Sequence, residues 1–185
     1  MRRVTLEGVT EFATIRYVIN IGMTTKVAAE RGRVWFALTD AAERVRWDAP
    51  LEAPIDVAPD HPRPGDHARW RYRLHGMPVV LHERTLEVVE GKRLRSAMSL
   101  GPFRFDLAYT LESEEGAART RLSAALSASN VVPVVGGVLD RFAVRRLASE
   151  IVAGALEGMR AHCKPEPRRR NKRGRTASDT PSPRL

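Results

Sequence analysis

The sequence predicts an α+β fold in which a curved antiparallel sheet packs against a long C-terminal helix. Between residues 51 and 128, apolar and polar side chains alternate along short runs separated by turn residues, which is typical of antiparallel strands. Residues 134 to 162 contain no proline and carry apolar side chains at helical intervals. The chain of 185 residues is 43% hydrophobic, which is enough to build the core of one domain.

The first predicted elements are a strand at residues 17 to 27 and two short helices. The strand has apolar side chains at alternate positions, which is the period of a half-buried strand. These apolar residues are Tyr17, Ile19, Ile21, Met23 and Val27. Residues 30 to 39 place Val34, Trp35 and Leu38 at helical spacing, and Gly32 weakens this helix by about 1 kcal/mol relative to alanine. A second short helix is predicted at residues 41 to 46.

Two strands are predicted next, at residues 51 to 57 and 68 to 74. Between them lies a stretch with three prolines and a glycine, which breaks the alternation. The second strand has one apolar face and one arginine face, so we expect the apolar face to be buried. The apolar face comprises Ala68, Trp70, Tyr72 and Leu74, and the other face comprises Arg69, Arg71 and Arg73.

Four further strands, at residues 78 to 90, 94 to 100, 103 to 111 and 122 to 128, bring the predicted total to seven. Glycine-containing turns separate them. In the strand at 78 to 90 we assign Val80, Leu86 and Val88 to the inner face by their shared parity. The inner positions of the next two strands are Leu94, Ser96, Met98, Leu100, Phe103, Phe105, Leu107 and Tyr109.

The terminal helix has an apolar stripe that changes side. Val135, Val138 and Phe142 share one side, whereas the later apolar residues lie nearly opposite, with two arginines at the change. Either the helix begins near Arg141 after a folded-in loop, or it faces two environments. Gly136 and Gly137 precede the change and indicate either a mobile gate or a tight packing bend.

The net charge of +9 is concentrated at the C-terminal end. Residues 164 to 185 account for +6 of it and contain four prolines and only two apolar residues, so we expect a basic disordered tail. We expect a domain at residues 15 to 163, and residues 1 to 14 form an N-terminal arm whose order the sequence leaves open. No apolar run approaches the ~20 residues of a membrane span, and no signal-peptide core follows Arg2 and Arg3, so we expect a cytoplasmic protein.

Disulfide, metal and cofactor sites are not predicted. Cys163 is the only cysteine, so no internal disulfide is possible. The five histidines are scattered without metal-ligand spacing, and neither a nucleophile motif nor a phosphate-binding glycine loop is present. We therefore expect no metal and no cofactor.

A motif at the first helix resembles that of the START-like superfamily, also called SRPBCC, which includes polyketide cyclase/dehydrases, lipid-transport proteins and the birch pollen allergen. Val27-Ala28, Glu30, Val34-Trp35, Leu38 and Asp40 are similar to the family's A-P-x-E-x-V-W-x-x-L-x-D entry into that helix, with Ala29 where proline is usual. Trp47, Gly65 and Thr120-Arg121-Leu122 also occupy family-like places. The resemblance covers residues 17 to 162 and implies a helix-grip fold, in which the long helix crosses the concave face of the sheet above a ligand cavity.

In that fold, the inward residues of the sheet and the long helix line the cavity and would contact an apolar ligand, unless they simply fill the space by packing on one another. The candidate ligand-binding residues are Trp70, Tyr72, Leu74, Val80, Arg84, Ser96, Met98, Phe103, Phe105, Leu107, Tyr109 and Phe142. His82, Arg84 and Ser96 interrupt the apolar face. A buried Arg84 needs an anionic partner, such as a ligand carboxylate or phenolate, because an unpaired buried charge is costly. Alternatively, a β-bulge reverses the parity, or Arg84 lies at the sheet end in solvent.

Three functions follow from this interpretation. The first is binding or carriage of a hydrophobic small molecule, such as a lipid, polyketide or isoprenoid. The second is an enzyme of the polyketide cyclase/dehydrase or aromatase type, with His82 and Tyr109 as candidate catalytic residues for proton transfer. The third is weak electrostatic contact of the basic tail with nucleic acid, a protein partner or an anionic membrane surface.

Overall fold

The computed structural model describes residues 14–114, 118–133 and 137–164. In these ranges the chain forms seven strands and three helices in the expected order. The elements are β1 (Thr14–Val27), α1 (Arg31–Thr39), α2 (Ala41–Trp47), β2 (Leu51–Val57), β3 (His67–Leu74), β4 (Met77–Val89), β5 (Arg93–Leu100), β6 (Phe103–Ser113), β7 (Thr120–Pro133) and α3 (Gly137–His162). Residues 1–13 of the expected N-terminal arm, residues 165–185 of the expected tail at 164 to 185, and Gly136 lie outside the described residues, while Thr14 is the first residue of β1.

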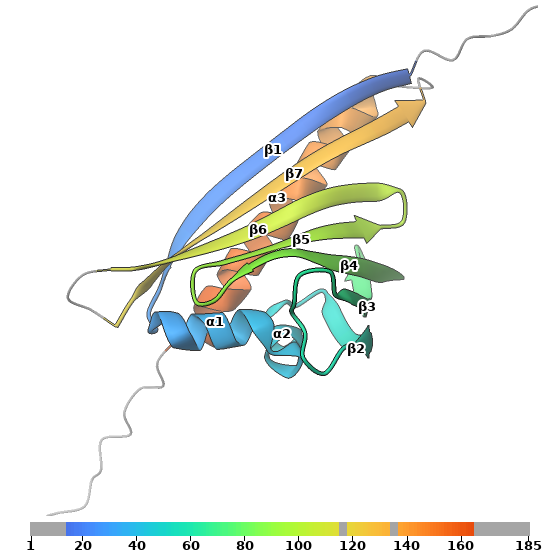
Figure 1. The fold of residues 1–185 in the computed structure, drawn as a ribbon. Helices are drawn as coiled ribbons and strands as arrows, with labels where there is room; N and C mark the ends of the chain where they lie inside the picture. The colour runs from blue at the N-terminus through green and yellow to red at the C-terminus, as the bar shows by residue number, and fades with distance from the viewer. Residues whose placement is uncertain (1–13, 115–117, 134–136, 165–185) are drawn as a thin grey trace, which may run out of the picture.

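The strands form one antiparallel sheet in the order β1-β7-β6-β5-β4-β3-β2. The first strand pairs with the last along its whole length, from Thr14 opposite Pro133 to Val27 opposite Thr120. The sheet curves around α3, which crosses its concave face, while α1 and α2 lie together at one end (Figure 1). The predicted helix-grip architecture is therefore confirmed.

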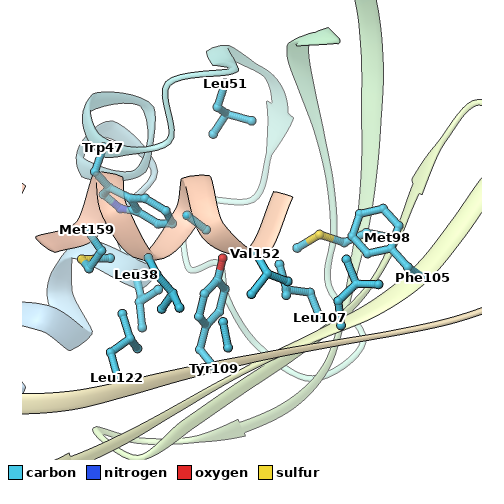
Figure 2. Packing of buried hydrophobic residues seen from close by; sticks show 14 of the residues in the cluster. Leu38, Trp47, Leu51, Met98, Phe105, Leu107, Tyr109, Leu122, Val152 and Met159 are labelled. Carbon is cyan, nitrogen blue, oxygen red and sulfur yellow. The ribbon is translucent and has the colours of Figure 1, made fainter. Parts of the chain in front are cut away.

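The core lies between α3 and the concave face of the sheet. The second half of α3 buries Ala148, Val152, Leu156 and Met159, and Figure 2 shows Val152 and Met159 facing side chains of the sheet. Because α3 begins at Gly137, the alternative of a helix that starts near Arg141 is wrong.

Two hydrogen bonds hold α2 in a fixed direction. Asp40 separates the two short helices, and its carboxylate accepts from the Glu43 backbone N–H at 2.8 Å, which caps the start of α2. At the other end, the Trp47 indole N–H donates to the Ala37 carbonyl at 2.6 Å. Since Trp47 is the last residue of α2, this bond also positions Asp48, which follows it.

Candidate functional site

The apolar face of β3 points into the core as expected. Trp70 and Tyr72 are buried and Leu74 is half-buried, while Arg69 and Arg71 on the other face are exposed. The inner positions predicted for β5 and β6 are also buried, apart from Phe103, which is half-buried and stacks on Phe105 with ring centroids 4.9 Å apart. Parity therefore placed the side chains of these three strands correctly.

On β4 the predicted parity is wrong. The inward residues are Leu81, Glu83 and Thr85, whereas His82 and Arg84 are exposed on the outer face. Val80 is also outward, with 41% of its surface exposed. The expected requirement for an anionic ligand at Arg84 therefore disappears.

A β-bulge explains the error. The pairing of β4 with β5 shifts register between Thr85 and Glu87, and Val88 beyond the shift stands opposite the buried Leu94. A bulge adds one residue to one strand, so positions before and after it change parity relative to each other. Val88 points inward, but counting back from it by twos assigns Val80 to the wrong face. The alternative that a β-bulge reverses the parity of this strand is therefore correct.

Phe142 is also placed incorrectly by the sequence. Its side chain is 70% exposed, so it does not face the core. The buried stripe of α3 starts at Ala148, about two turns later. The helix therefore presents Phe142 to solvent and its second half to the sheet.

A buried ion pair that the sequence did not reveal occupies the inner face near α2. Arg44 of α2 donates to Glu83 of β4 at 2.5 Å, and the Trp70 indole N–H donates to the same carboxylate oxygen at 2.9 Å. The Arg44 guanidinium also lies 5.0 Å from the centre of the Trp70 ring. Burial raises the pKa of Glu83, but the Arg44 charge and further polar neighbours outweigh it, so the pKa is lowered and the pair stays ionised.

Next to this pair, a cavity of about 150 Å³ opens between α3 and the end of β3. We call it the Asp48 cavity. Its lining residues are Asp48, Pro50, Tyr72, Arg73, Leu74, His75, Leu147, Glu150, Ile151, Gly154 and Ala155. A volume of about 150 Å³ accommodates a benzene-sized group. Tyr72 and Leu74 are the candidate residues from the sequence that line it, and the other inward candidates face the core elsewhere.

Asp48 is the polar centre of this cavity. Among the described residues, its carboxyl group has no hydrogen-bond or salt-bridge partner. Burial raises its pKa to about 6; the Arg44 charge opposes this shift and the Glu83 charge adds to it. A carboxyl group with this pKa exchanges a proton near neutrality, as a general acid or base must.

Two tyrosines share the surroundings of Asp48. Tyr72 lies on the cavity wall, and Tyr109 points from β6 towards α3, with its ring 6.4 Å from that of Trp47 (Figure 2). Burial, with the Asp48 charge adding to it, raises the pKa of both hydroxyls, so both remain protonated. Neither hydroxyl has a hydrogen-bond partner in the described part of the chain, so both are available as donors.

The mouth of the cavity is formed by charged pairs. His75, at the turn between β3 and β4, contacts Glu150 of α3 at 3.0 Å, and Glu150 also accepts from Arg146 at 2.8 Å. Arg73 donates to Glu52 at 2.7 Å. His75 and Arg146 are largely exposed and the other three side chains are partly exposed, so the cavity opens to solvent on this side.

Two other features complete the inner surface. Thr85 and Ser96 stand opposite each other on β4 and β5, and each hydroxyl is buried without a hydrogen-bond partner.

No group of metal-ligating side chains occurs within the described ranges. No helix within those ranges is long and apolar enough to cross a membrane.

Comparison with known proteins is consistent with this geometry. A family model described as polyketide cyclase / dehydrase and lipid transport matches residues 19–164. The chain belongs to this family. Membership of the polyketide cyclase/dehydrase and lipid transport family, together with the fold, is consistent with hydrophobic ligand binding or with polyketide cyclase-type activity. No curated protein matches the chain.

Solved structures of START-like proteins share the fold of this family member at low sequence identity. The Zhui aromatase/cyclase from Streptomyces sp. R1128 has a TM-score of 0.65 and 13% identity over 80% of this chain and 94% of its own. A START superfamily protein from Mycobacterium smegmatis has a TM-score of 0.62 and 17% identity over 78% and 96%. A protein of unknown function from Staphylococcus aureus has a TM-score of 0.64 and 10% identity over 80% and 94%. At these identities the likeness concerns the fold alone.

Sequence reasoning missed Arg44, Glu83 and Asp48. Arg44 and Asp48 lie in and just after a short helix with charged side chains all round, where nothing marks one of them as buried. For Glu83, a signal was present in the pairing of β3 with β4. His82 stands opposite Arg69 on the exposed arginine face of β3, whereas Glu83 stands opposite Ala68 on its apolar face, so Glu83 is expected to point inward.

Proposed function

We propose that this protein binds a small, predominantly apolar molecule in the Asp48 cavity, with the polar end of the molecule at Asp48 and Tyr72. The observation that carries the proposal is a cavity of about 150 Å³ in which the Asp48 carboxyl group and the Tyr72 hydroxyl group have no hydrogen-bond partner among the described residues. Burial in the cavity reduces the hydration of the Asp48 carboxyl group, and a ligand that supplies a hydrogen bond there compensates for the lost water contacts. The aliphatic side chains of α3 supply the apolar contact.

Binding can be tested by blocking the cavity. Gly154 lies on the cavity wall, and a Cβ atom there meets nothing within 4 Å, so Gly154→Leu fills the space. Ala153→Leu is the matched control, because Ala153 is the exposed neighbour on the same helix and does not line the cavity. Toluene binding, followed by NMR titration, is expected in the wild type and in Ala153→Leu and is expected to be lost in Gly154→Leu. Equal binding in all three proteins would contradict the proposal.

A natural ligand can be sought directly. Native mass spectrometry of the protein purified from its own host is expected to reveal a co-purifying apolar compound that is absent from Gly154→Leu. A compound retained by Gly154→Leu would have to bind elsewhere.

The second candidate function is proton-transfer catalysis of the cyclase/dehydrase kind, and the raised pKa of Asp48 favours it. Ionised Asp48 would accept a proton from a carbon next to a carbonyl group, and the Tyr72 hydroxyl would donate a hydrogen bond to the enolate oxygen that forms. His82 does not reach this cavity, so Asp48 replaces it as the candidate base.

Turnover of a poly-β-ketone analogue tests this second candidate. Asp48→Asn is expected to abolish turnover, and His82→Ala is expected to leave it unchanged. Turnover that survives in Asp48→Asn would eliminate Asp48 as the base.

The basic tail supports a separate proposal of weak electrostatic contact with nucleic acid, a protein partner or an anionic membrane. The support is its charge and composition, because seven Lys or Arg side chains and two acidic ones lie between residues 165 and 185. Such contact is expected to weaken steeply as salt rises.

A further inference from the structure

The charges around the Asp48 cavity are not balanced. Arg73 and His75 line the cavity, and each contacts a carboxylate, Glu52 and Glu150 respectively. The nearest cation in the interior is Arg44, which donates to Glu83. Arg44, Arg73 and Arg146 therefore each have a carboxylate partner, and His75 shares Glu150 with Arg146.

Asp48 is the exception to this pairing. Its carboxyl group lies on the cavity wall without a hydrogen-bond or salt-bridge partner in the described ranges, close enough to Arg44 and Glu83 for both charges to act on it. Arg44 and Glu83 cancel each other, so ionised Asp48 leaves the interior with one net negative charge. Tyr72 beside it offers a neutral hydroxyl.

From this imbalance we infer that the Asp48 cavity selects apolar molecules that end in a protonated amine and rejects those that end in a carboxylate. The inference rests on the proposed binding function. An ammonium group would form a charge-assisted hydrogen bond with Asp48, whereas a ligand carboxylate would meet Asp48 and Glu83 with no unpaired cation to compensate. An alcohol would bind with intermediate affinity.

The same geometry gives the selection a pH dependence. Asp48 is acted on by Arg44 and Glu83 from the interior, with Tyr109 on β6, Tyr72, Arg73 and His75 on the β3 side and Glu150 on α3. Because its pKa is about 6, Asp48 is ionised at about pH 8 and protonated at about pH 5. The affinity for an amine therefore falls as the pH decreases through about 6, while the affinity for a neutral molecule changes little.

The experiment compares four compounds that share a benzene-sized body: toluene, benzyl alcohol, benzylamine and benzoate. Affinities for the full-length protein are measured by NMR titration at about pH 8 and about pH 5. At the higher pH benzylamine is expected to bind at least about tenfold more tightly than toluene, and benzoate at least about tenfold more weakly than benzylamine. At the lower pH the advantage of benzylamine is expected to shrink to about threefold or less.

A matched pair of variants assigns the selection to Asp48. Asp48→Asn keeps the shape and removes the charge, so it is expected to lose the preference for benzylamine and still bind toluene. Asp56→Asn removes an exposed carboxylate of β2 that pairs with Arg69 on the outer face, and it is expected to keep the wild-type preference.

The outcomes separate the two proposals. If no compound binds the wild type, the proposed binding function is overturned and the selection with it. If toluene binds but benzylamine binds no more tightly than benzoate, only the selection is overturned. A benzylamine preference that stays at about tenfold in Asp48→Asn, or at about pH 5, also overturns it.

Discussion

Asp48 is the residue at which stability and the proposed function conflict. Its carboxyl group titrates near pH 6 because burial disfavours the charged form. A carboxyl group whose pKa is raised by folding stabilises the protein only while it is protonated, and this contribution is lost as the pH rises towards the folded value. At neutral pH Asp48 is therefore destabilising, which is typical of residues retained for a site.

The first prediction concerns Asp48→Asn. This variant is expected to be more stable than the wild type by about 1–3 kcal/mol at neutral pH, because the neutral amide avoids the cost of a buried charge. The difference is expected to vanish below about pH 4, where Asp48 is protonated in both states. Urea unfolding at several pH values measures it, with Asp56→Asn as the exposed control. A gain that persists in acid would point to a cause other than ionisation.

The contribution of the Arg44–Glu83 pair to stability depends on pH in the opposite direction to that of Asp48. The pKa of Glu83 is lowered in the folded protein, so the pair stabilises the fold above the unfolded pKa of Glu83 and this contribution is lost as the pH falls through the folded value. Both side chains are buried, so removal of one partner leaves the other uncompensated.

The second prediction concerns this pair. Glu83→Ala is expected to cost about 3–5 kcal/mol of unfolding free energy because Arg44 remains buried without its partner. The double replacement Arg44→Met, Glu83→Leu is expected to recover most of that loss, since it buries apolar groups instead. Urea unfolding measures the unfolding free energy of the single and double variants. A double variant as unstable as Glu83→Ala would show that the ionic contact itself, rather than a stranded charge, is responsible.

At the scale of elements, α3 contacts α2 through a glycine. A Cβ atom added at Gly158 would overlap the Trp47 carbonyl oxygen, which is backbone and cannot rotate away. The close approach places the end of α2, and hence Asp48, against the helix that forms the opposite cavity wall. Gly154, one turn earlier, has open space instead.

The third prediction uses these two glycines as a matched pair. Gly158→Ala is expected to destabilise the protein by about 1–3 kcal/mol, because the new methyl group forces the two helices apart. Gly154→Ala is expected to stabilise it by about 0.5–1 kcal/mol, because alanine has the higher helix propensity and meets no neighbour. Thermal and urea unfolding compare them. Similar changes in unfolding free energy for the two variants would mean that α2 and α3 move apart without loss of stability.

At the scale of the whole molecule, charge and cavity lie in different parts of the chain. The family match ends at residue 164, and the segment beyond it has a net charge of +5. The cavity is lined by residues between Asp48 and Ala155. None of the described lining residues belongs to the basic segment.

The fourth prediction follows from this separation. Removal of residues 165–185 is expected to leave the melting temperature and the affinity for benzylamine unchanged and to abolish binding of single-stranded RNA at low salt. Calorimetry and fluorescence anisotropy measure the two properties. If benzylamine affinity falls with the truncation, the proposed separation is wrong.

The sequence by itself determined the order of elements, the antiparallel sheet and the inward faces of β3, β5 and β6. It could do so because strict alternation in each of these strands reports which side chains lie in the core. Alternation failed on β4, where the register shift between Thr85 and Glu87 reversed the parity of His82 and Arg84.

Only the tertiary structure decided where the site lies. Asp48, Tyr72 and Ile151 come from a loop, a strand and a helix that are far apart in the chain, and no local pattern relates them. The raised pKa of Asp48 likewise comes from burial and, to a smaller extent, from the charge of Glu83, while the charge of Arg44 opposes the shift; only packing brings these groups together. Local periodicity determines secondary structure, whereas a cavity and its electrostatics depend on contacts between distant segments.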